Sequence, residues 1–577
     1  MTPSRRVLRL VLAVTVAATV TSCVGVPTDG PVVEAHQQGQ NVPSRGTFNN
    51  PPPPSPGATQ EEIMSGFLDA MTATPLSTRR AQEFLTTTAR EQWRPVRVLS
   101  YSGQRTHVRG SDVVLRLLGA EQVGAVGQWQ GRVPDRDARI TFPMVRQNGE
   151  WRIAQVPNAL IVPEDFYASN YESASLYYFD PTGRILVPEP VHVPQGSQLA
   201  TALVNDLLHG APSSTSSVSQ TFIPPGLSVD FSVPVSNGVA EVSLSGSADS
   251  APLDRGTVRR MLAQFAWTLR QDPSINAFTL KIAGRPVTDA TGASTFSVGH
   301  DDQSPLDPSV PGATEVFFAL RRGRLVSGQV KLLTPVGGPF GSQALGVDTF
   351  AVDLPGQRVA AVLSDSLVLG SVLDERPTVP VLSGSGLLRP AWDFANRLWE
   401  VQNGPGGARV VEISSGRPHD VRVPGITGED VRRFLVSRDG SRLVAVVHRA
   451  ARDRILVSRL RYDPRGRVIG AARAHRIPWS STGTPRIRDI GWTSPTTIAV
   501  LDQLASRAEV RILNVDGSTR PSEISPIVVN GEVRALATSP GGQSPYAVQR
   551  TTLVNISPAG PTRSVSISGL REFTYAG

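Results

Sequence analysis

The hydrophobic pattern near the start of the folded part has the period of a helix. Residues 59–71 place apolar side chains on one helical face, behind a capping-box pair formed by Thr59 and Glu62. A second helix is predicted to begin near Ser77, and a short third turn to end near Trp93. We therefore expect a small group of helices before any strand.

From residue 96 the pattern alternates, as it does in strands. Strands are predicted at 96–101, 112–118, 121–130, 138–147 and 150–156. The last two are joined across Asn148-Gly149, a strong hairpin signal. Helices followed by a curved antiparallel sheet resemble the NTF2-like cone, so residues 59–190 are predicted to form an α+β NTF2-like domain. That fold often encloses a pocket, but the sequence shows no matching catalytic pair.

Residues 191–305 repeat the mixture of helix and strand in a second α+β domain. Helices are predicted over 200–208 and 254–271, and strands at 227–233, 239–244 and 277–282, with a turn at Asn237-Gly238. Four segments together resemble the GerMN domain, named from a spore germination lipoprotein: 202–208, 223–226, 238–242 and 284–287.

From residue 314 to 577 the pattern is all-β with an irregular repeat. Five matching strand positions lie 37, 45, 55 and 48 residues apart: Ala361, Leu398, Leu443, Ile498 and Tyr546. This spacing is close to that of a four-stranded propeller blade, about 40–50 residues. Residues 315–333 supply either a further blade or the closure of the ring, and the number of blades stays open. We expect a β-propeller.

The beginning of the chain has the pattern of an export signal, residues 1–22. Arg5, Arg6 and Arg9 precede an apolar stretch over 10–20, which is too short to span a membrane. It ends in a sequence that resembles the bacterial lipobox: Val20, Thr21, Ser22 and Cys23. Cys23 is predicted to carry an S-linked diacylglycerol and an N-acyl chain such as palmitate. The alternatives of general secretory and twin-arginine export remain open.

Cys23 is the only cysteine in 577 residues, so the exported domains have no intramolecular disulfide. Residues 23–58 combine the lipidated cysteine with a proline-rich stretch, which we interpret as a tether. After the signal there is no apolar run of about 18 residues. The predicted location is the extracytoplasmic face of the cell membrane, with the lipid as the membrane attachment.

Charge is divided unevenly along the chain. Residues 320–577 hold 33 basic and 21 acidic residues, whereas the first 319 hold 24 and 28. A basic half would ordinarily suggest nucleic acid, but predicted export argues against that partner. Anionic lipid head groups, envelope polymers or an acidic protein surface are the more plausible attractors. All but two of the basic residues are arginines, which suggests a GC-rich genome.

Candidate chemistry is sparse, and we predict no enzyme, no cofactor and no metal site. The eight histidines are never closer than the 17 residues from His192 to His209, so no local metal pair occurs. Neither a Gly-x-Ser-x-Gly elbow nor a phosphate loop is present. Three tryptophans could line a sugar-binding face, but their place in the repeated strands favours packing inside blades: Trp392, Trp399 and Trp492.

The lipobox, tether, helix-then-sheet domain, GerMN-like domain and propeller, in this order, resemble the LpqB lipoprotein family of actinobacteria. The resemblance implies an envelope lipoprotein that acts on the extracytoplasmic sensor domain of a membrane histidine kinase of the MtrA–MtrB type. It also implies a connection with cell-wall homeostasis and division. No catalytic residues carry over; only Cys23 does. The alternative is a protein that binds or cleaves an envelope glycan or peptidoglycan through the propeller or the cone pocket.

Overall fold

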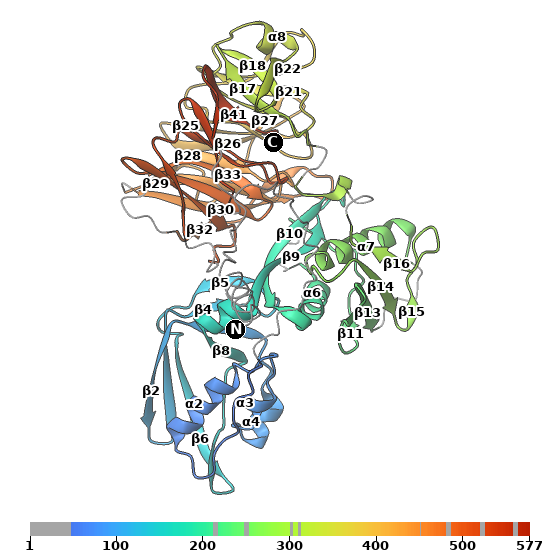
Figure 1. Cartoon of the computed structure of the whole chain (residues 1–577), viewed down its shortest axis with the longest axis vertical. Coiled ribbons are helices and arrows are strands. Elements are labelled where there is room, and N and C mark those ends of the chain that lie inside the picture. The colour runs from blue at the N-terminus through green and yellow to red at the C-terminus, as the bar shows by residue number, and fades with distance from the viewer. Residues whose placement is uncertain are drawn as a thin grey trace, which may run out of the picture. The chain divides into compact units, whose positions relative to one another are not determined.

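The computed structural model (Figure 1) describes residues 48–211, 217–246, 253–299, 304–309, 313–450, 452–479, 486–519, 525–557 and 564–577. The predicted signal, the lipobox and Cys23 lie outside these residues. Residues from Phe48 onward form one unit by their contacts. No helix among the described residues combines the length and the apolar character needed to cross a membrane.

The first domain begins with the predicted helices: α2 (Gln60–Ala70), α3 (Arg79–Gln82) and α4 (Thr87–Gln92). The capping box is confirmed, because Glu62 Oε2 accepts from Thr59 N at 2.7 Å and Thr59 Oγ1 accepts from Glu62 N at 3.3 Å. Helix α2 lies close to Phe84: a Cβ at Gly66 would be 2.5 Å from Phe84 Cε1. The α2 face predicted to be apolar is buried in the core of this domain.

Two four-stranded sheets follow, in the orders β5-β4-β1-β8 and β2-β3-β6-β7. Asn148 and Gly149, with φ of 53° and 81°, form the predicted hairpin turn between the last two strands of the second sheet. Strand β2 was not predicted. The strands are β1 (Arg97–Tyr101), β2 (Gly103–Arg109), β3 (Asp112–Leu118), β4 (Glu121–Val123), β5 (Trp129–Arg132), β6 (Arg139–Gln147), β7 (Glu150–Ile153) and β8 (Ala159–Pro163).

The prediction of one strand over 121–130 is wrong, because a turn divides it into β4 and β5. Gly124 N donates to Gln128 O at 2.8 Å, and Gly127 has a φ of 73°. A Cβ at Gly127 would be 3.0 Å from His192 O. The turn therefore brings the chain close to a strand about 65 residues further on.

A long hairpin, missed by the sequence analysis, follows helix α5 (Glu164–Asn170). Strands β9 (Tyr171–Phe179) and β10 (Leu186–Pro194) pair in nine antiparallel positions. Side chains of both strands pack into the same core as the two helices of the next domain, α6 (Leu199–Leu208) and α7 (Arg255–Leu269). We call β9–β10 the junction hairpin. The domain limits given above stay predictions.

The sheet of the second domain has the order β11-β13-β14-β15, with β12 and β16 paired to β13 and β14. Strands β13 and β14 are parallel, and α7 begins at the predicted residue, since Asp254 caps it. Asn237 and Gly238 have positive φ and make the predicted turn. The strands are β11 (Ser228–Val229), β12 (Val235–Ser236), β13 (Val239–Ser245), β14 (Ala277–Ile282), β15 (Arg285–Pro286) and β16 (Thr295–Ser297).

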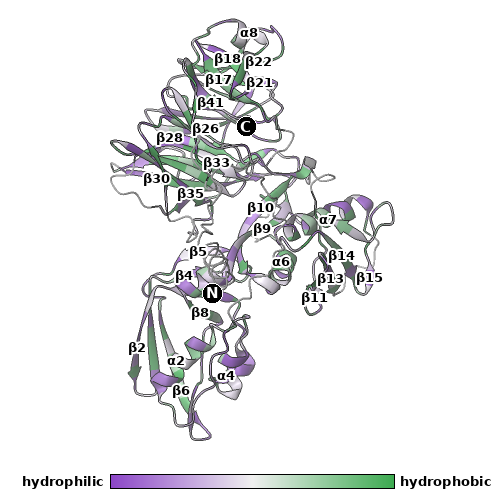
Figure 2. Ribbon diagram, viewed as in Figure 1, coloured by the Kyte–Doolittle hydropathy of each residue, from purple (hydrophilic) through white to green (hydrophobic). Residues whose placement is uncertain are grey.

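The remaining strands build a propeller, and the described residues contain six of its sheets. Figure 2 shows green, apolar stretches among the purple ones in the blades. Apolar side chains of neighbouring blades pack into shared cores. Short α8 (Gly338–Ser342) follows the first blade. The first three blades contain β17 (Phe317–Arg321), β18 (Arg324–Gln329), β19 (Leu332–Pro335), β20 (Thr349–Val352), β21 (Arg358–Leu363), β22 (Ser366–Ser371), β23 (Val379–Ser383), β24 (Ala391–Trp392), β25 (Leu398–Gly404), β26 (Gly407–Ser414) and β27 (Arg417–Asp420).

The other three blades contain β28 (Asp430–Val436), β29 (Arg442–Arg449), β30 (Arg452–Tyr462), β31 (Val468–Ala471), β32 (His475–Ile477), β33 (Ile487–Ser494), β34 (Thr497–Gln503), β35 (Arg507–Asn514), β36 (Ile527–Asn530), β37 (Ala535–Ala537), β38 (Tyr546–Val548), β39 (Thr552–Asn555) and β40 (Ser564–Ser566). All five matching positions of the repeat lie on the second strand of a blade, which confirms the repeat.

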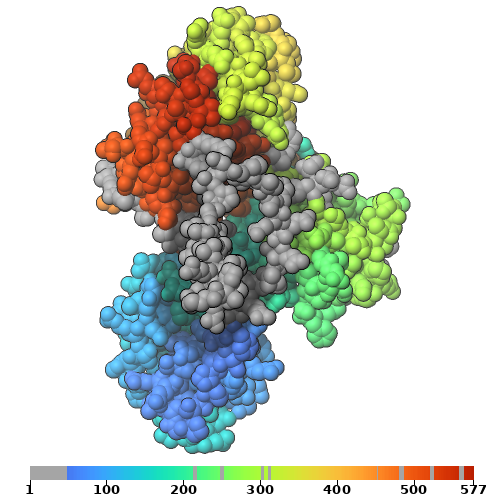
Figure 3. Space-filling view, viewed as in Figure 1, coloured from blue at the N-terminus to red at the C-terminus, as the bar shows by residue number. Residues whose placement is uncertain are grey.

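The ring is closed by the end of the chain. Strand β41 (Leu570–Thr574) pairs antiparallel with β17 and completes the first blade. Figure 3 shows this closure as red C-terminal atoms directly against yellow-green atoms of the first blade. The segment 315–333 thus forms most of a blade, one of the two alternatives expected from the sequence.

Candidate interaction site at the hairpin–propeller junction

A buried arginine connects the junction hairpin to the propeller. Arg442 begins β29 and its side chain is only 1% exposed. Its Nη2 donates to Pro188 O on β10, and Nη1 donates to Ser441 Oγ at 3.0 Å. The guanidinium also lies 3.6 Å from Glu189 and 3.8 Å from Asp439. An unpaired charge at this depth would be strongly unfavourable, so these contacts are needed to keep it there.

Burial and, to a smaller degree, the neighbouring charge of Arg459 lower the pKa of Arg442 to about 10. Glu189 acts in the other direction, because it accepts two hydrogen bonds from Arg459 and lies beside Arg442. One carboxylate of the hairpin is therefore shared by two arginines of the propeller and compensates part of their charge. Arg442 stays charged at neutral pH, since a pKa near 10 is still well above it.

His192 of β10 lies where three parts of the chain meet. Its Nε2 is 3.4 Å from Asp516 Oδ2, which belongs to the propeller turn after β35. Its ring centroid is 5.4 Å from that of Trp129 and 6.2 Å from that of Tyr167, both in the first domain. Tyr167 in turn stacks on Tyr171 at 4.9 Å. The histidine therefore contacts the first domain and the propeller at once.

The carboxyl of Asp516 is adapted to this position. Burial alone would raise its pKa, but a hydrogen bond and the charge of His192, with hydrogen bonds from Ser518, hold the pKa below its ordinary value. The ionised form of Asp516 is thus favoured by its partners, as expected for a carboxylate that accepts several hydrogen bonds.

Further contacts fix the tip of the junction hairpin. Asp180 accepts from Arg184 N at 2.7 Å and from Ile185 N at 3.0 Å, which closes the turn. The Arg184 guanidinium carbon lies 5.5 Å from the ring centroid of Phe394 in the third blade. The tip is therefore held by its own hydrogen bonds and contacts a propeller loop through a cation–π interaction.

A second buried arginine joins the propeller's own ends. Arg438 donates to Ser309 O, before the first blade, and to Ala576 O, two residues beyond the last strand. Burial lowers its pKa to about 10. Its hydrogen-bond acceptors are backbone carbonyls, so peptide dipoles solvate its charge, and the charge of Asp307 adds to their effect. This contact reinforces the closure made by β41.

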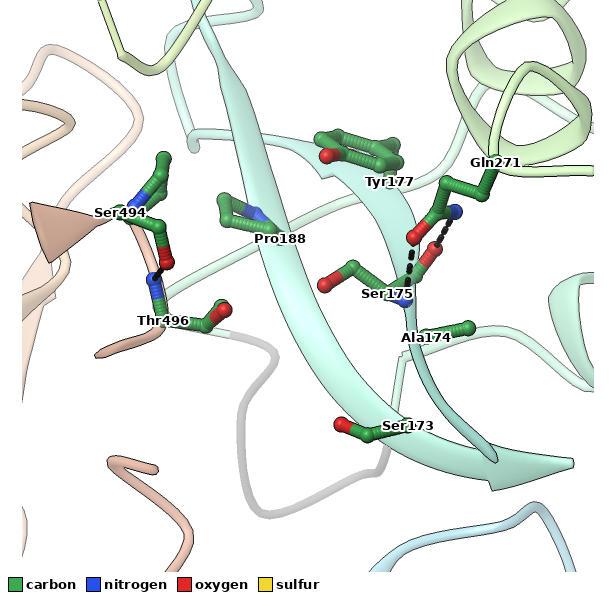
Figure 4. Close-up of a pocket in the computed structure, with 9 residues that line it drawn as sticks. Ser173, Ala174, Ser175, Tyr177, Pro188, Gln271, Ser494 and Thr496 are labelled. Atoms are coloured by element: carbon green, nitrogen blue, oxygen red, sulfur yellow. Dashed lines mark hydrogen bonds between the residues drawn. The ribbon is translucent and has the colours of Figure 1, made fainter. Parts of the chain in front are cut away.

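A small cavity of about 200 Å³ lies between the junction hairpin and the turn from β33 to β34 (Figure 4). Gln271 borders it and exchanges two hydrogen bonds with the backbone of Ser175, at 2.8 and 2.6 Å. Ser494 and Thr496 face it from the propeller side. Its polar groups are hydroxyls and amides, and it is smaller than the roughly 300–1,000 Å³ typical of ligand pockets.

The three tryptophans considered for sugar binding pack inside blades. Trp392 is 1% exposed, Trp399 0% and Trp492 7%. Trp399 Nε1 donates to Asp393 Oδ2 at 3.0 Å, and Trp492 Nε1 donates to Val436 O at 3.0 Å. This confirms the packing interpretation. Within the described ranges, no three His, Cys, Asp or Glu side chains are grouped so as to hold a metal ion.

Sequence reasoning missed the junction residues. The sequence analysis identifies Leu443 as a position of the blade repeat but assigns no role to Arg438, Asp439 or Arg442. The sequence contains one local signal. Arg442 directly precedes the apolar run 443–447, so its side chain has to be buried or to extend past the sheet edge. Its acceptor, Pro188, lies 254 residues away and has no local signature.

Three family models match the chain in the order of its modules. "Lipoprotein LpqB, N-terminal domain" covers residues 53–168, "Sporulation and spore germination" covers 175–288, and "Lipoprotein LpqB beta-propeller domain" covers 323–564. The two LpqB models together span more than half of the sequence. The chain belongs to the LpqB lipoprotein family. Membership confirms the resemblance found in the sequence, with an α/β first region, a germination-type domain and a propeller.

Relatives in this family have low sequence identity to this chain but match it over most of both lengths. Lipoprotein LpqB of Thermobifida fusca is 25% identical over 93% of this chain and 94% of its own length. That of Mycobacterium bovis (strain BCG / Pasteur 1173P2) is 28% identical over 77% and 78%, and that of Streptomyces avermitilis 25% over 84% and 85%. The family is one of lipoproteins, which makes this chain an envelope lipoprotein.

Two solved structures each match less than half of this chain. A chain of a nidogen/laminin complex covers 45% of this chain and 98% of its own length, with 11% identity and a TM-score of 0.33. The β-propeller domain of Cps50 (Swd1) from Myceliophteria thermophila covers 38% and 70%, with 12% identity and a TM-score of 0.28.

Proposed function

We propose that this protein is a lipid-anchored accessory regulator on the extracytoplasmic face of the cell membrane. It binds the extracytoplasmic sensor domain of a histidine kinase of the MtrA–MtrB type and thereby influences cell-wall homeostasis and division. Family membership supports the envelope location. The kinase as partner comes from what the family resemblance implies.

The observation that carries a binding role is which groups the buried charged side chains contact. Arg442 and Arg438 are buried and Asp516 is half-buried, and each joins one segment of the chain to another. A catalytic site would instead direct such groups into a cleft where substrate could reach them. The cavity at the junction offers only hydroxyl, amide and phenol groups. These observations favour an interaction protein over an enzyme.

A glycan-binding or glycan-cleaving role is favoured by no specific observation. The tryptophans that suggested it are buried in blades, out of reach of a sugar ring. For the first domain we keep the NTF2-like cone as a proposal. Its support is that side chains of α2 and of strands from both sheets share one hydrophobic core.

Direct binding can be tested by titrating the mature chain, with Cys23→Ser to keep it free of lipid, into the purified sensor domain of the cognate kinase. We expect saturable heat in calorimetry at low salt. Binding should weaken as salt rises, because a propeller half with an excess of basic residues would act through screened charges. A flat titration at low salt would contradict direct contact.

The anchor has its own test. Cys23→Ser removes the thiol that would carry the diacylglycerol, so the protein should leave the membrane fraction or keep its signal uncleaved. Fractionation and labelling with a radioactive fatty acid measure both effects. Persistent acyl labelling of the serine variant would show that the lipid is attached elsewhere.

A further inference from the structure

Three arginines occupy directly opposite positions on three neighbouring strands of the first domain. Arg105 on β2 faces Arg116 on β3, and Arg116 faces Arg139 on β6. We call these three residues the arginine row. Neighbouring strands lie about 4.8 Å apart, so the row extends over roughly 10 Å. Like charges directly opposite each other in a sheet are destabilising, so this arrangement calls for a reason.

The row lies on the face of the sheet that points away from the core. On β3 the alternate residues Val113, Leu115 and Leu117 are buried, which turns Arg116 to the other side. All three arginines of the row are exposed. The strands β2 and β6 that carry its ends are labelled in Figure 1.

Along the row lies a groove of about 500 Å³. His107, next but one to Arg105 on β2, lines it, together with Asp135 and Arg136 from the segment before β6. Asp135 is the one carboxylate among the lining residues. Four arginines thus share a groove with a single acidic group, and the groove has a net positive charge.

The guanidinium groups of the row have no hydrogen-bonded or ionic partner in the part of the chain that the structure describes. Arg146 of the same sheet does have partners, because it donates to Gly149 O at 2.9 Å and packs on Trp151. Arg109 has no hydrogen bond or ion pair among the described residues, but its cross-strand neighbour is the acidic Asp112. What distinguishes the row is that the cross-strand neighbours of its arginines are themselves arginines.

We propose that the arginine row binds the phosphates of anionic phospholipid head groups. Guanidinium groups match the oxygens of a phosphate with two parallel hydrogen bonds, and they repel each other less once an anion lies between them. The row is extended along the sheet and does not converge on one centre, so it fits several phosphates side by side. An anionic bilayer presents phosphates side by side in this way on its surface.

The location of the row agrees with this ligand. The first domain is the folded part nearest to the predicted anchor in sequence, so it has the shortest reach to the membrane. Membrane binding through an acyl chain is commonly reinforced by a basic surface patch. This inference rests on the proposed envelope location, and it adds a second membrane contact that would orient the domain.

The test uses the whole mature chain with Cys23→Ser, so that no acyl chain contributes. Sedimentation with vesicles of phosphatidylglycerol and phosphatidylcholine is compared with vesicles of phosphatidylcholine alone. We expect binding only to the anionic vesicles. Replacing the row by glutamine, at Arg105, Arg116 and Arg139, should reduce partitioning roughly a hundredfold, since each arginine near an anionic surface contributes about fivefold.

A matched variant separates the row from total charge. Arg417, Arg422 and Arg461 are exposed on the propeller, and changing them to glutamine removes the same three charges. It should leave vesicle binding within about twofold. Equal losses in the two triple variants, or no binding of the parent to anionic vesicles, would overturn the proposal. Thermal unfolding of both variants checks that they fold.

A soluble phosphate compound would offer the row the same chemistry as a lipid head group, and pyrophosphate is the probe for it. It should compete with the vesicles only weakly, because it engages one part of the row. Tight binding of pyrophosphate to the row without vesicle binding would identify a soluble phosphate ligand and would refute the membrane assignment. The titration with the kinase sensor domain contains no membrane, so its outcome is independent of this one.

Discussion

Arginines at the hairpin–propeller junction and arginines in the row of the first domain differ in nearly every physical respect. Arg442 is 1% exposed and contacts Pro188, Ser441, Glu189 and Asp439. Arginines of the row are exposed, have each other as cross-strand neighbours and have no partner among the described residues. The first set is satisfied within the chain, whereas the second is left for a ligand.

The difference shows why total charge is a poor guide to binding. The propeller half has the excess of basic residues, yet several of its arginines are internal and already neutralised. The net-acidic half contains the uncompensated row. What attracts an anion is the local excess of unpaired charge within a Debye length, about 8 Å at physiological salt.

The largest effect is expected when a buried arginine is removed. Arg442→Met should destabilise the propeller by about 3–5 kcal/mol, because it leaves Asp439 buried without its cation and Pro188 O without its donor. The midpoint of denaturant unfolding, followed by tryptophan fluorescence, measures the loss. Arg461→Met, on the exposed side of β30, should change stability by less than about 0.5 kcal/mol.

A double variant sharpens this prediction. Adding Asp439→Asn to Arg442→Met removes the uncompensated carboxylate, so part of the lost stability should return. If the double variant were as unstable as the sum of the two single ones, the pair would not interact and the account of the junction would be wrong.

A smaller effect is expected at Asp516, the propeller carboxylate that contacts His192. The pKa of Asp516 is lowered in the folded protein, so its contribution to stability is present above the ordinary value near 4 and is lost as pH falls through the lowered pKa. Asp516→Asn should cost about 1–2 kcal/mol at neutral pH and almost nothing in strong acid. Thermal melts across pH 2–7 measure this convergence.

The matched control is Asp365→Asn, an exposed propeller carboxylate. Its stability profile should follow that of the parent within a few tenths of a kcal/mol at every pH, as is usual for surface changes. A gap between parent and Asp516→Asn that stayed constant down to pH 2 would mean that packing, and not ionisation, explains the effect.

Local signals explain what the sequence could predict. The Thr59–Glu62 capping box and the turns at Asn148-Gly149 and Asn237-Gly238 need only neighbouring residues, and all three are present. The propeller repeat was also recognisable, because each blade has the same alternation. The lipobox and Cys23 were predicted from the residues themselves and lie outside the described part.

Features that depend on distant parts of the chain were missed. The junction hairpin has no clean alternation, because the second core covers one side and the propeller contacts residues such as Pro188 and Glu189. The break in 121–130 reflects the close approach of Gly127 to His192. The arginine row needs the register of three strands, one of which was not predicted.

The smallest expected effect concerns the row without any ligand. Arg116→Thr removes the central charge and places a β-branched residue on an exposed strand position. Because repulsion from Arg105 and Arg139 is relieved, the first domain should become more stable by about 0.2–1 kcal/mol at low salt. The gain should shrink at 1 M salt, where the Debye length is about 3 Å. Thermal melts at the two salt concentrations measure it, with Arg109→Thr as the control.

Arg109 lies opposite Asp112, so its loss should cost stability at low salt. A salt-independent gain for Arg116→Thr would reflect strand propensity alone, and the row would then carry no electrostatic strain for a phosphate to relieve.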